Sequence, residues 1–273
     1  MTASRPGLPK LVATDLDGTI VGSDDTVSAR TVAAFERVAA AGIPIVGVTG
    51  RGPRLLSMCQ RDLPSAGHFV LGQGATVVEL DGDTPRTLHR QEMDGALVGG
   101  ALTRLEVVTG PLSVLVEPAT ATDDLLLGEP HPSWRWSNAV RRCGRDEACA
   151  GSVLKAFAHS DTYDADELLA LARRVIGTGV VELTQAGLGY LEICPLGATK
   201  ASGLAVVTQH LGVDPADVLV FGDMPNDLPM FEFAGWHRVA VANAHPELRA
   251  VADEITETCA DDGVARYLER LLG

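Results

Sequence analysis

Short apolar runs alternate with helical patterns along the first third of the chain. Leu11–Thr14, Ile45–Thr49 and His68–Leu71 are apolar and run into polar turns, as buried strands do. Between them, Ser28–Ala41 has apolar residues at helical spacing behind a possible Ser cap, and Pro53–Leu63 begins with a proline in its first turn. This order predicts parallel strands joined by right-handed helical crossovers.

The pattern changes in the middle of the chain. Thr76–Leu80 and Thr87–Gln91 flank Asp81-Gly82-Asp83 and predict a hairpin. A helix is expected from about Met93, and residues 118–151 show no clear pattern. The other elements expected in this region are strands at Ser113–Glu117, Val153–Ala158, Val180–Thr184 and Tyr190–Ile193, with a helix at Asp164–Ile176. This block favours an α+β domain.

After Pro195 the first pattern returns. The expected elements are helices around Thr199–Leu211, Asp227–Ala234 and Val264–Leu272 and strands at Val218–Phe221 and Arg238–Val241. We therefore predict an α/β fold, a doubly wound (Rossmann-like) parallel sheet core interrupted by an inserted α+β domain. The expected boundaries are 1–86 and 193–273 for the core and 87–192 for the insertion.

Composition and charge exclude several classes of protein. The 273 residues carry a formal charge of −14, the wrong sign for a nucleic-acid binder or for docking on an anionic membrane. No apolar run approaches the roughly 18 residues that span a bilayer, and the first ten residues do not resemble a signal peptide. The five cysteines are odd in number and scattered, which favours free thiols and a cytoplasmic location.

Polar residues follow the predicted core strands. Asp15–Thr19 follows the first strand, Thr49–Arg51 the second and Gly222–Asp227 a later one, while Lys200 opens the helix after the insertion. Ligands of doubly wound sheets bind at the carboxyl ends of the strands, so we expect these groups on one rim.

The carboxylates on this rim suggest a cation. Asp15 and Asp17 are two residues apart, and Asp223, Asn226 and Asp227 have the spacing of one side of a helix start. A hard divalent ion with oxygen ligands relieves the repulsion in such a cluster, and Mg2+ also accepts phosphate oxygens. Together with Lys200 and the helix N-termini, such a cation would make the site attractive to a phosphate dianion despite the negative net charge.

Each of these segments has an ordinary structural explanation when it stands alone. An Asp-x-Asp pair is often a solvated turn, and a single lysine such as Lys200 is usually a solvated helix residue. Four such segments, each at its own strand end or helix start, favour a functional site. The spacing of Cys143, Cys149 and His131 fits no usual zinc pattern.

The ordered segments resemble the haloacid dehalogenase superfamily of phosphotransferases. The four segments that match the motifs of that superfamily are Asp15–Thr19, Thr49–Arg51, Gly197–Lys200 and Gly222–Asp227. The position of the insertion is similar to the large-cap, Cof-like branch, as are Asn243-Ala244 and Asp262-Gly263-Val264. That branch usually has Asn-Gly-Ala after the third strand, whereas this chain has Gln73-Gly74-Ala75.

The resemblance implies a role for each motif residue. Asp15 would be the nucleophile that forms an aspartyl-phosphate, and Asp17 the general acid and base. Lys200 would complete the catalytic set, and Thr49, Gly50 and Asn226 would bind the phosphoryl group. Mg2+ would be bound by Asp15, the backbone carbonyl of Asp17, Asp223 and Asp227.

The insertion would form a cap that selects the substrate. The cap residues that are candidates for substrate contact are His131, Trp134, Trp136, Arg141, Arg142, His159 and Tyr190, each of which also has an ordinary structural explanation. The expected enzyme is a Mg2+-dependent phosphatase of small phosphomonoesters, such as sugar or polyol phosphates. A phosphosugar mutase and a catalytically silent regulator that binds phosphometabolites are the alternatives. A monomer and a homodimer both stay open.

Overall fold

The computed structural model describes residues 7–80, 84–119, 125–134, 139–177, 179–185 and 189–273. Their contacts divide the chain into two units. The core unit comprises residues up to 50 together with 56–89 and 199–273, and the cap unit comprises 51–55 and 90–198. Residues 51–55, which the sequence assigns to the core, therefore group with the cap unit. Each unit has its own hydrophobic core.

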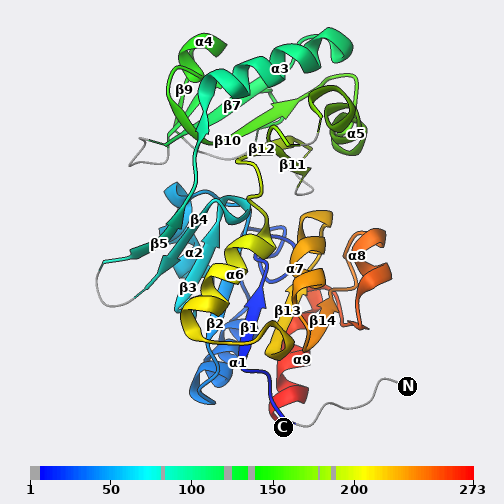
Figure 1. Ribbon diagram of the computed structural model, residues 1–273. Coiled ribbons are helices and arrows are strands. Elements are labelled where there is room, and N and C mark those ends of the chain that lie inside the picture. Colours follow the sequence, from blue (N-terminus) through cyan, green and yellow to red (C-terminus); the bar gives the residue numbers. More distant parts are fainter. Residues whose placement is uncertain (1–6, 81–83, 120–124, 135–138, 178, 186–188) are drawn as a thin grey trace. The chain divides into compact units, whose positions relative to one another are not determined.

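The core unit is built on an eight-stranded sheet with the order β15-β14-β13-β1-β2-β3-β4-β5 (Figure 1). Its strands are β1 (Leu11–Thr14), β2 (Ile45–Val48), β3 (His68–Leu71), β4 (Thr76–Glu79), β5 (Arg86–Arg90), β13 (Val218–Gly222), β14 (His237–Ala240) and β15 (Glu254–Ile255). The strands from β15 to β3 in this order pair in parallel, and β4 runs antiparallel to β3. β1 therefore lies between β13 and β2.

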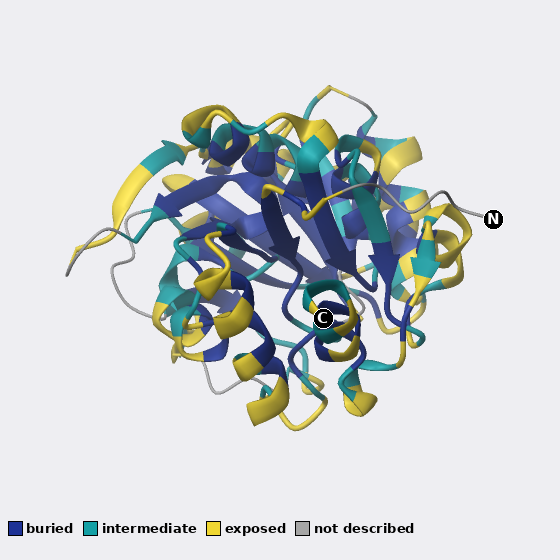
Figure 2. Ribbon diagram, turned by 90° about the horizontal axis from the view of Figure 1, so that it is seen from below, coloured by how far each residue is buried: buried dark blue, intermediate teal, exposed yellow. Residues whose placement is uncertain are grey.

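Helices cover both faces of this sheet, with α1 and α9 packed together on one face and α6 and α7 on the other (Figure 1). The helices are α1 (Ala29–Ala40), α2 (Leu56–Asp62), α6 (Lys200–Leu211), α7 (Leu228–Phe233), α8 (Pro246–Val251) and α9 (Gly263–Leu272). Figure 2 shows buried strands between helices whose outer sides are exposed. This two-sided cover is why the parallel strands are apolar throughout and not alternating.

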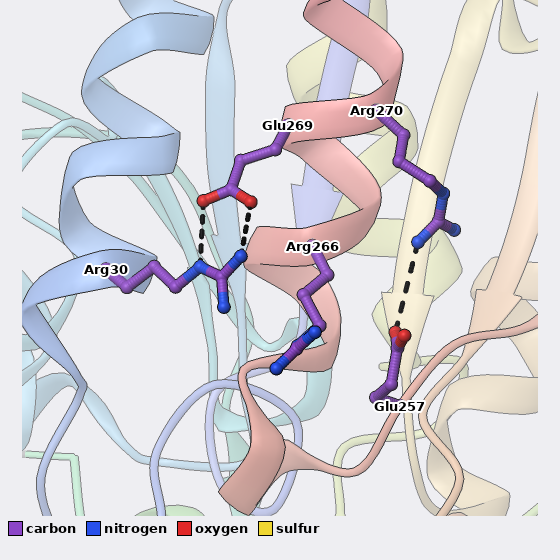
Figure 3. Close-up of a pocket in the computed structure, with 5 residues that line it drawn as sticks. All are labelled: Arg30, Glu257, Arg266, Glu269 and Arg270. Carbon is purple, nitrogen blue, oxygen red and sulfur yellow. Dashed lines mark hydrogen bonds and ion pairs between the residues drawn. The ribbon is translucent and has the colours of Figure 1, made fainter.

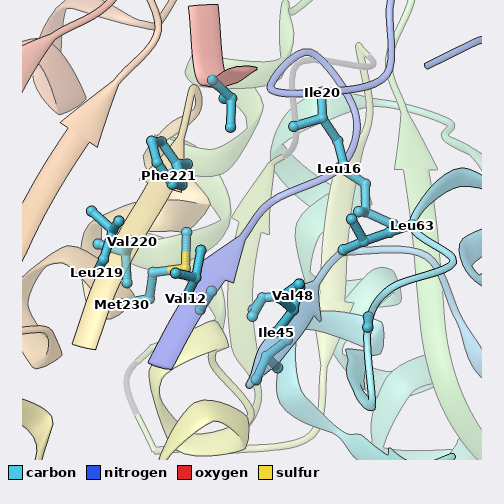
Figure 4. Packing of buried hydrophobic residues seen from close by; sticks show 14 of the residues in the cluster. Val12, Leu16, Ile20, Ile45, Val48, Leu63, Leu219, Val220, Phe221 and Met230 are labelled. Carbon is cyan, nitrogen blue, oxygen red and sulfur yellow. The ribbon is translucent and has the colours of Figure 1, made fainter. Parts of the chain in front are cut away.

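Side chains from both faces of β1 and β13 fill the core (Figure 4). Val12 and Phe221 are fully buried, and Met230 from α7 reaches the same cluster. Burying a side chain of this size contributes about 1.5–3 kcal/mol. The strands that carry the polar rim are thus firmly anchored.

The cap unit is a second, mostly antiparallel sheet with the order β11-β12-β10-β7-β8-β9, and β6 pairs with β10. Its strands are β6 (Met93–Asp94), β7 (Ser113–Pro118), β8 (Leu125–Glu129), β9 (Ala139–Arg141), β10 (Ser152–His159), β11 (Glu182–Gln185) and β12 (Leu191–Cys194). Its helices are α3 (Gly95–Thr109), α4 (Arg145–Ala148) and α5 (Ala165–Ile176). α3 and α5 pack against each other.

The α/β fold class with an inserted α+β unit is confirmed. The elements that the sequence analysis missed are short: β8, β9 and α4 lie in the stretch without a clear pattern, while β6, α8 and β15 span two, six and two residues. Segments of this length hold too few apolar positions to define a period. In the part of the chain that the structure describes, no helix is long and apolar enough to cross a membrane.

Candidate active site

The strand order brings the predicted rim residues to one edge of the core sheet. Asp15 directly follows β1, Asp223 directly follows β13, and Thr49 directly follows β2. Because these three strands are parallel neighbours, their carboxyl ends meet. Lys200 is the first residue of α6, and Asp227 ends the short 3-10 turn after Asp223.

Lys200 joins two carboxylates in the interior. Its Nζ lies 2.5 Å from Asp15 Oδ1 and 2.6 Å from Asp227 Oδ1. The lysine is 1% exposed, Asp15 is 5% exposed and Asp227 is fully buried. Charge-assisted bonds at this distance are the strong kind, and they hold the ammonium at a fixed point beside Asp15.

The start of α6 fixes the position of Lys200. Thr199 is the N-cap, and its hydroxyl accepts a hydrogen bond from the backbone N–H of Ser202 at 3.1 Å. The Ser202 hydroxyl in turn accepts from the backbone N–H of Thr199 at 3.0 Å. This reciprocal pair is a capping box, so α6 begins at a defined residue.

Asp227 has both carboxylate oxygens occupied by protein donors. Oδ1 bonds to Lys200, and Oδ2 accepts from the backbone N–H groups of Asp223 at 2.9 Å and of Met224 at 3.0 Å. Asp227 thereby shapes the loop that carries Asp223.

Asp15, Asp223 and Asp227 form a group that can bind a metal ion. Each offers a carboxylate oxygen, and these atoms lie within 4.8 Å of one another. The hydroxyl of Thr19 lies 3.2 Å from Asp15 Oδ2 and 3.2 Å from Asp223 Oδ1. Among the described residues, the carboxylate of Asp17 is outside this group, and Asp17 lies half-buried on the turn that bridges to Val21.

Burial sets the electrostatics of the carboxylates. It raises the pKa of Asp15 to about 7, against the lowering effect of Lys200, and the nearby Asp227 and Asp17 add to the increase. Burial and the charges of Asp15 and Asp227 raise the pKa of Asp223 to about 9. Burial opposes the charge of Lys200, but Asp15 and Asp227 outweigh it and raise its pKa. The cluster is therefore short of positive charge.

Gly18 allows the first loop to approach Asp223. Its φ is +83°, and a Cβ at this position would lie 2.3 Å from Asp223 Oδ2. Only glycine is compatible with both the left-handed backbone and this close approach. The Gly18 carbonyl also accepts a hydrogen bond from Asn243 Nδ2 at 2.9 Å, which ties the loop to the C-terminal segment.

The predicted phosphate-binding residues are linked through Gln73. Its Oε1 accepts from Asn226 Nδ2 at 3.2 Å, and its backbone N–H donates to the Thr49 carbonyl at 3.2 Å. Gln73 is 2% exposed and adopts a left-handed conformation with φ +61°. Gly50 follows Thr49 at the end of β2 and is half-buried.

Thr19 and the contacts of Gln73 were missed by sequence reasoning. Thr19 belongs to the first motif. A hydroxyl residue two positions after Asp17 in the sequence was the signal that could have identified it. The cap unit holds further missed residues: Lys155 lies 2.5 Å from Glu192, and both are at most 2% exposed. The sequence signal for this pair was one charged residue inside each of two apolar strands, Lys155 in β10 and Glu192 in β12.

The cap candidates fall into two groups. Arg141 and Arg142 are exposed and pair with Glu147 and Glu129, as a solvated face does. The aromatic group is more ordered: His131 stacks on His159, Trp134 meets Tyr190 edge-on at 5.2 Å, and the Tyr190 hydroxyl lies 3.1 Å from that of Ser133. Trp136 lies outside the described residues. Among the described residues, neither Cys143 nor Cys149 belongs to a group of side chains that could bind a metal ion.

A charged pocket between α1 and α9 is not a second catalytic site. Figure 3 shows its lining, in which Arg30 bonds to Glu269 through two nitrogens, and Arg270 faces Glu257 at 3.9 Å. The remaining cation, Arg266, donates from Nε to the Asp261 carbonyl. Opposite charges already neutralise one another at this exposed surface.

Comparison with known proteins agrees with this geometry. A model of haloacid dehalogenase-like hydrolases matches residues 12–109 and 145–268. The chain is 27% identical to the 5-amino-6-(5-phospho-D-ribitylamino)uracil phosphatase of Bacillus subtilis, over 96% of this chain and 98% of that protein.

Two solved structures share the fold. A sugar phosphatase of haloacid dehalogenase subclass IIB has a TM-score of 0.78 at 19% identity, covering 96% of this chain and 98% of its own. A phosphatase from Bacteroides thetaiotaomicron has a TM-score of 0.78 at 20% identity, covering 99% and 98%. The motif resemblance and the enzyme class expected from the sequence are confirmed, because this chain belongs to the haloacid dehalogenase-like hydrolases, as a phosphatase of the Cof-like branch.

Proposed function

We propose that this protein is a Mg2+-dependent phosphatase that hydrolyses small phosphomonoesters, such as sugar or polyol phosphates, through an aspartyl-phosphate on Asp15. The observation that carries the proposal is the buried Asp15 carboxylate, which Lys200 contacts at 2.5 Å beside two further carboxylates. Phosphoryl transfer requires a positioned nucleophile and positive charge around the transferred group. The carboxyl ends of these strands bring together a carboxylate nucleophile, the Lys200 ammonium and carboxylates that can bind a metal ion.

The acidic group fits Mg2+. Its donors are hard carboxylate oxygens, and burial leaves Asp223 with a raised pKa that a divalent cation would reverse. Asp15 and Asp223 would be direct ligands, and the backbone carbonyl of Asp17 would join them. Asp227, with both oxygens engaged, would orient the ligand loop. When bound, Mg2+ supplies positive charge that neutralises the phosphoryl oxygens.

Asp15 would act as the nucleophile. One of its carboxylate oxygens attacks phosphorus, the bond from phosphorus to the leaving alkoxide breaks, and an acyl phosphate forms on Asp15. Lys200, Thr49, the Gly50 amide and Asn226 would hold the equatorial oxygens. Donors that are already fixed before the reaction stabilise the developing charge without reorganisation.

Asp17 would act as the general acid and then as the general base. It lies two residues from Asp15 and is half-buried. As an acid it would protonate the leaving alkoxide, and as a base it would then take a proton from the water that attacks the acyl phosphate. Water attack releases inorganic phosphate and regenerates Asp15.

The proposed substrate class rests on the names of relatives. The Bacillus subtilis relative is named for a phosphorylated ribityl metabolite, and one structural neighbour for sugar phosphates. Both names support a small polyhydroxylated phosphoester. The cytoplasmic location stays part of the proposal, in keeping with five cysteines that are all free thiols.

The decisive experiment is phosphate release from a panel of sugar, polyol, nucleotide and coenzyme phosphates. Wild type should release phosphate with Mg2+, and chelator should abolish the release. The variant Asp15→Asn should be inactive while keeping the wild-type circular dichroism spectrum. Release that persists in Asp15→Asn, or a folded wild type that is silent on every ester, would contradict the proposal.

A mutase is the enzyme alternative. In phosphomannomutases of the same superfamily, the fourth motif usually has a longer, glycine-rich spacer between its first Asp and its Asn-Asp pair. Here only Met224 and Pro225 separate Asp223 from Asn226. The short spacing favours the phosphatase. A mutase would conserve total ester phosphate and need a bisphosphorylated activator, so net phosphate release separates the two. A silent binder would bind beryllium fluoride without turnover.

A further inference from the structure

A second group of metal-ligating side chains lies in the core unit, away from the rim. His68 is the first residue of β3, Glu79 is the last residue of β4, and His210 lies in the last turn of α6. His68 and Glu79 are direct partners in the antiparallel register. The rim lies at the carboxyl ends of the parallel strands, so this group is at the opposite end of β3.

His68 has an unusual environment for a histidine. It is 7% exposed, and among the described residues neither ring nitrogen has a hydrogen-bond partner. Its Nε2 lies 3.6 Å from Glu79 Oε1, which is too long for a hydrogen bond. Buried polar atoms are nearly always paired, so an imidazole with two unsatisfied nitrogens is available to bind a ligand.

The three side chains converge at a spacing that suits a metal ion. His210 Nε2 lies 3.1 Å from Glu79 Oε1, and one ligand atom from each residue lies within 4.8 Å of the others. Ligand atoms of a tetrahedral zinc site are about 3.3 Å apart, given bonds of about 2.0–2.1 Å. The exposed end of α6 leaves room for a small rotation of the His210 ring.

The surroundings favour a metal with nitrogen ligands. The His68 ring is buried with its Nε2 3.6 Å from Glu79 Oε1, so an imidazole nitrogen faces the carboxylate oxygen. Arg86 donates two hydrogen bonds to Glu79 Oε2 and leaves Oε1 turned toward the histidines. Ligating carboxylates are typically anchored in this way. Arg86, whose side chain is 61% exposed, also lies 3.5 Å from His210 Nε2.

We propose that His68, Glu79 and His210 bind a borderline first-row divalent cation, of which Zn2+ is the representative, and that this ion ties β3, β4 and α6 together. Two imidazoles and one carboxylate select such an ion over Mg2+, which prefers oxygen ligands. The site is separate from the acidic group at the rim. The ion would replace the present contact between His210 Nε2 and Glu79 Oε1.

The test measures metal binding and needs no substrate. Protein in excess Mg2+, which occupies the carboxylate group, is incubated with Zn2+, desalted and analysed for bound metal. Wild type should retain one equivalent, while His210→Ala and Glu79→Gln should weaken Zn2+ binding by more than about tenfold. His89→Ala, a half-buried histidine on β5 outside the cluster, is the matched control and should behave as wild type.

Two further readouts identify the ligands. Co2+ substituted into the site should give the visible absorption of a low-symmetry site with nitrogen ligands, and His210→Ala should lose it. Zn2+ should raise the melting temperature of wild type but not of Glu79→Gln. Equal Zn2+ retention in wild type and both variants, or no retention in wild type, would overturn the proposal. Phosphate release with Mg2+ should be unchanged in His210→Ala, so this test stands apart from the proposed function.

Discussion

Lys200 is the residue on which the electrostatics of the rim depend. It supplies the positive charge between Asp15 and Asp227 and cannot be replaced by solvent, because all three groups are buried. We expect Lys200→Ala to lower kcat for phosphate release by about 10²–10³-fold, the loss typical of one preorganised electrostatic donor. The assay uses saturating Mg2+ and the preferred ester.

Lys10→Ala is the matched control, because Lys10 is exposed and pairs with Asp217 at the surface. It should leave kcat unchanged, since exposed ion pairs contribute little. A Lys200→Ala enzyme that retains wild-type turnover would show that the Lys200 charge is not used in catalysis. Denaturant unfolding should also show a loss of stability in Lys200→Ala, which leaves two buried carboxylates without their counter-ion.

Gln73 stands at a position where the branch that this chain resembles usually has asparagine. Its longer side chain reaches Asn226, and asparagine, one methylene shorter, would not. We expect Gln73→Asn to keep the left-handed turn, which asparagine tolerates well, so the free energy of unfolding should be nearly unchanged. Loss of the contact should raise KM about three- to tenfold, equivalent to one ordinary hydrogen bond.

A double-mutant cycle with Asn226→Ala separates positioning from a general effect. If Gln73 acts through Asn226, then Gln73→Asn should add little to the defect of Asn226→Ala. Additive defects would mean that Gln73 acts by another route.

At the residue scale, the sequence was sufficient to place the motif residues on one rim and insufficient to name their hydrogen-bond partners. Asp15, Lys200 and Asp223 could be named because each follows a strand or opens a helix, and strand ends meet in a parallel sheet. The bond from Asn226 to Gln73 joins residues 153 positions apart and depends on side-chain length, which no periodicity encodes. The same holds for Lys155 and Glu192, whose pairing requires the register of β10 and β12.

At the element scale, the start of α6 should link stability to catalysis. Thr199 caps the helix, and Lys200, to which the proposed function assigns a catalytic role, is the next residue. We expect Thr199→Ala to destabilise the protein by about 1 kcal/mol, the usual value of an N-cap, and also to lower kcat because the position of Lys200 becomes less defined. Urea unfolding and phosphate release measure the two effects.

Ser28→Ala provides the control for a helix cap that does not adjoin Lys200. Ser28 caps α1, on the other face of the sheet from α6, through the Thr31 N–H at 3.0 Å, and its hydroxyl also donates to Asp262 Oδ1 at 2.5 Å. It should cost a similar free energy of unfolding and leave kcat unchanged. Equal effects of the two variants on kcat would argue that the α6 cap has no special role in catalysis.

Elements were predictable in proportion to their length and regularity. α1 and α5, each with a strong apolar stripe and a capping residue, lie within one residue of the expected bounds. β9 and α4 have three and four residues, too few for a period to show. Their place is decided by the neighbouring strands of the cap sheet, which is tertiary information.

At the scale of the whole molecule, the charge of −14 affects how a metal stabilises the fold. Any salt screens the repulsion between the negative charges of such a chain. An ion that binds at a site in the native state alone also stabilises that state by mass action. We expect Mg2+ at one hundred times its Kd to add about 2.7 kcal/mol to the free energy of unfolding. Thermal unfolding in a Mg2+ titration measures this.

The specific contribution is separated from screening by two comparisons. NaCl at equal ionic strength should give only the smaller, screening part of the rise in melting temperature. Asp223→Asn removes one carboxylate from the buried group while leaving the surface charge nearly intact, so its melting temperature should respond to Mg2+ and NaCl alike. If Mg2+ and NaCl raised the melting temperature of wild type equally, the acidic group would not bind Mg2+. The native state would then be stabilised only by the screening of its negative charges.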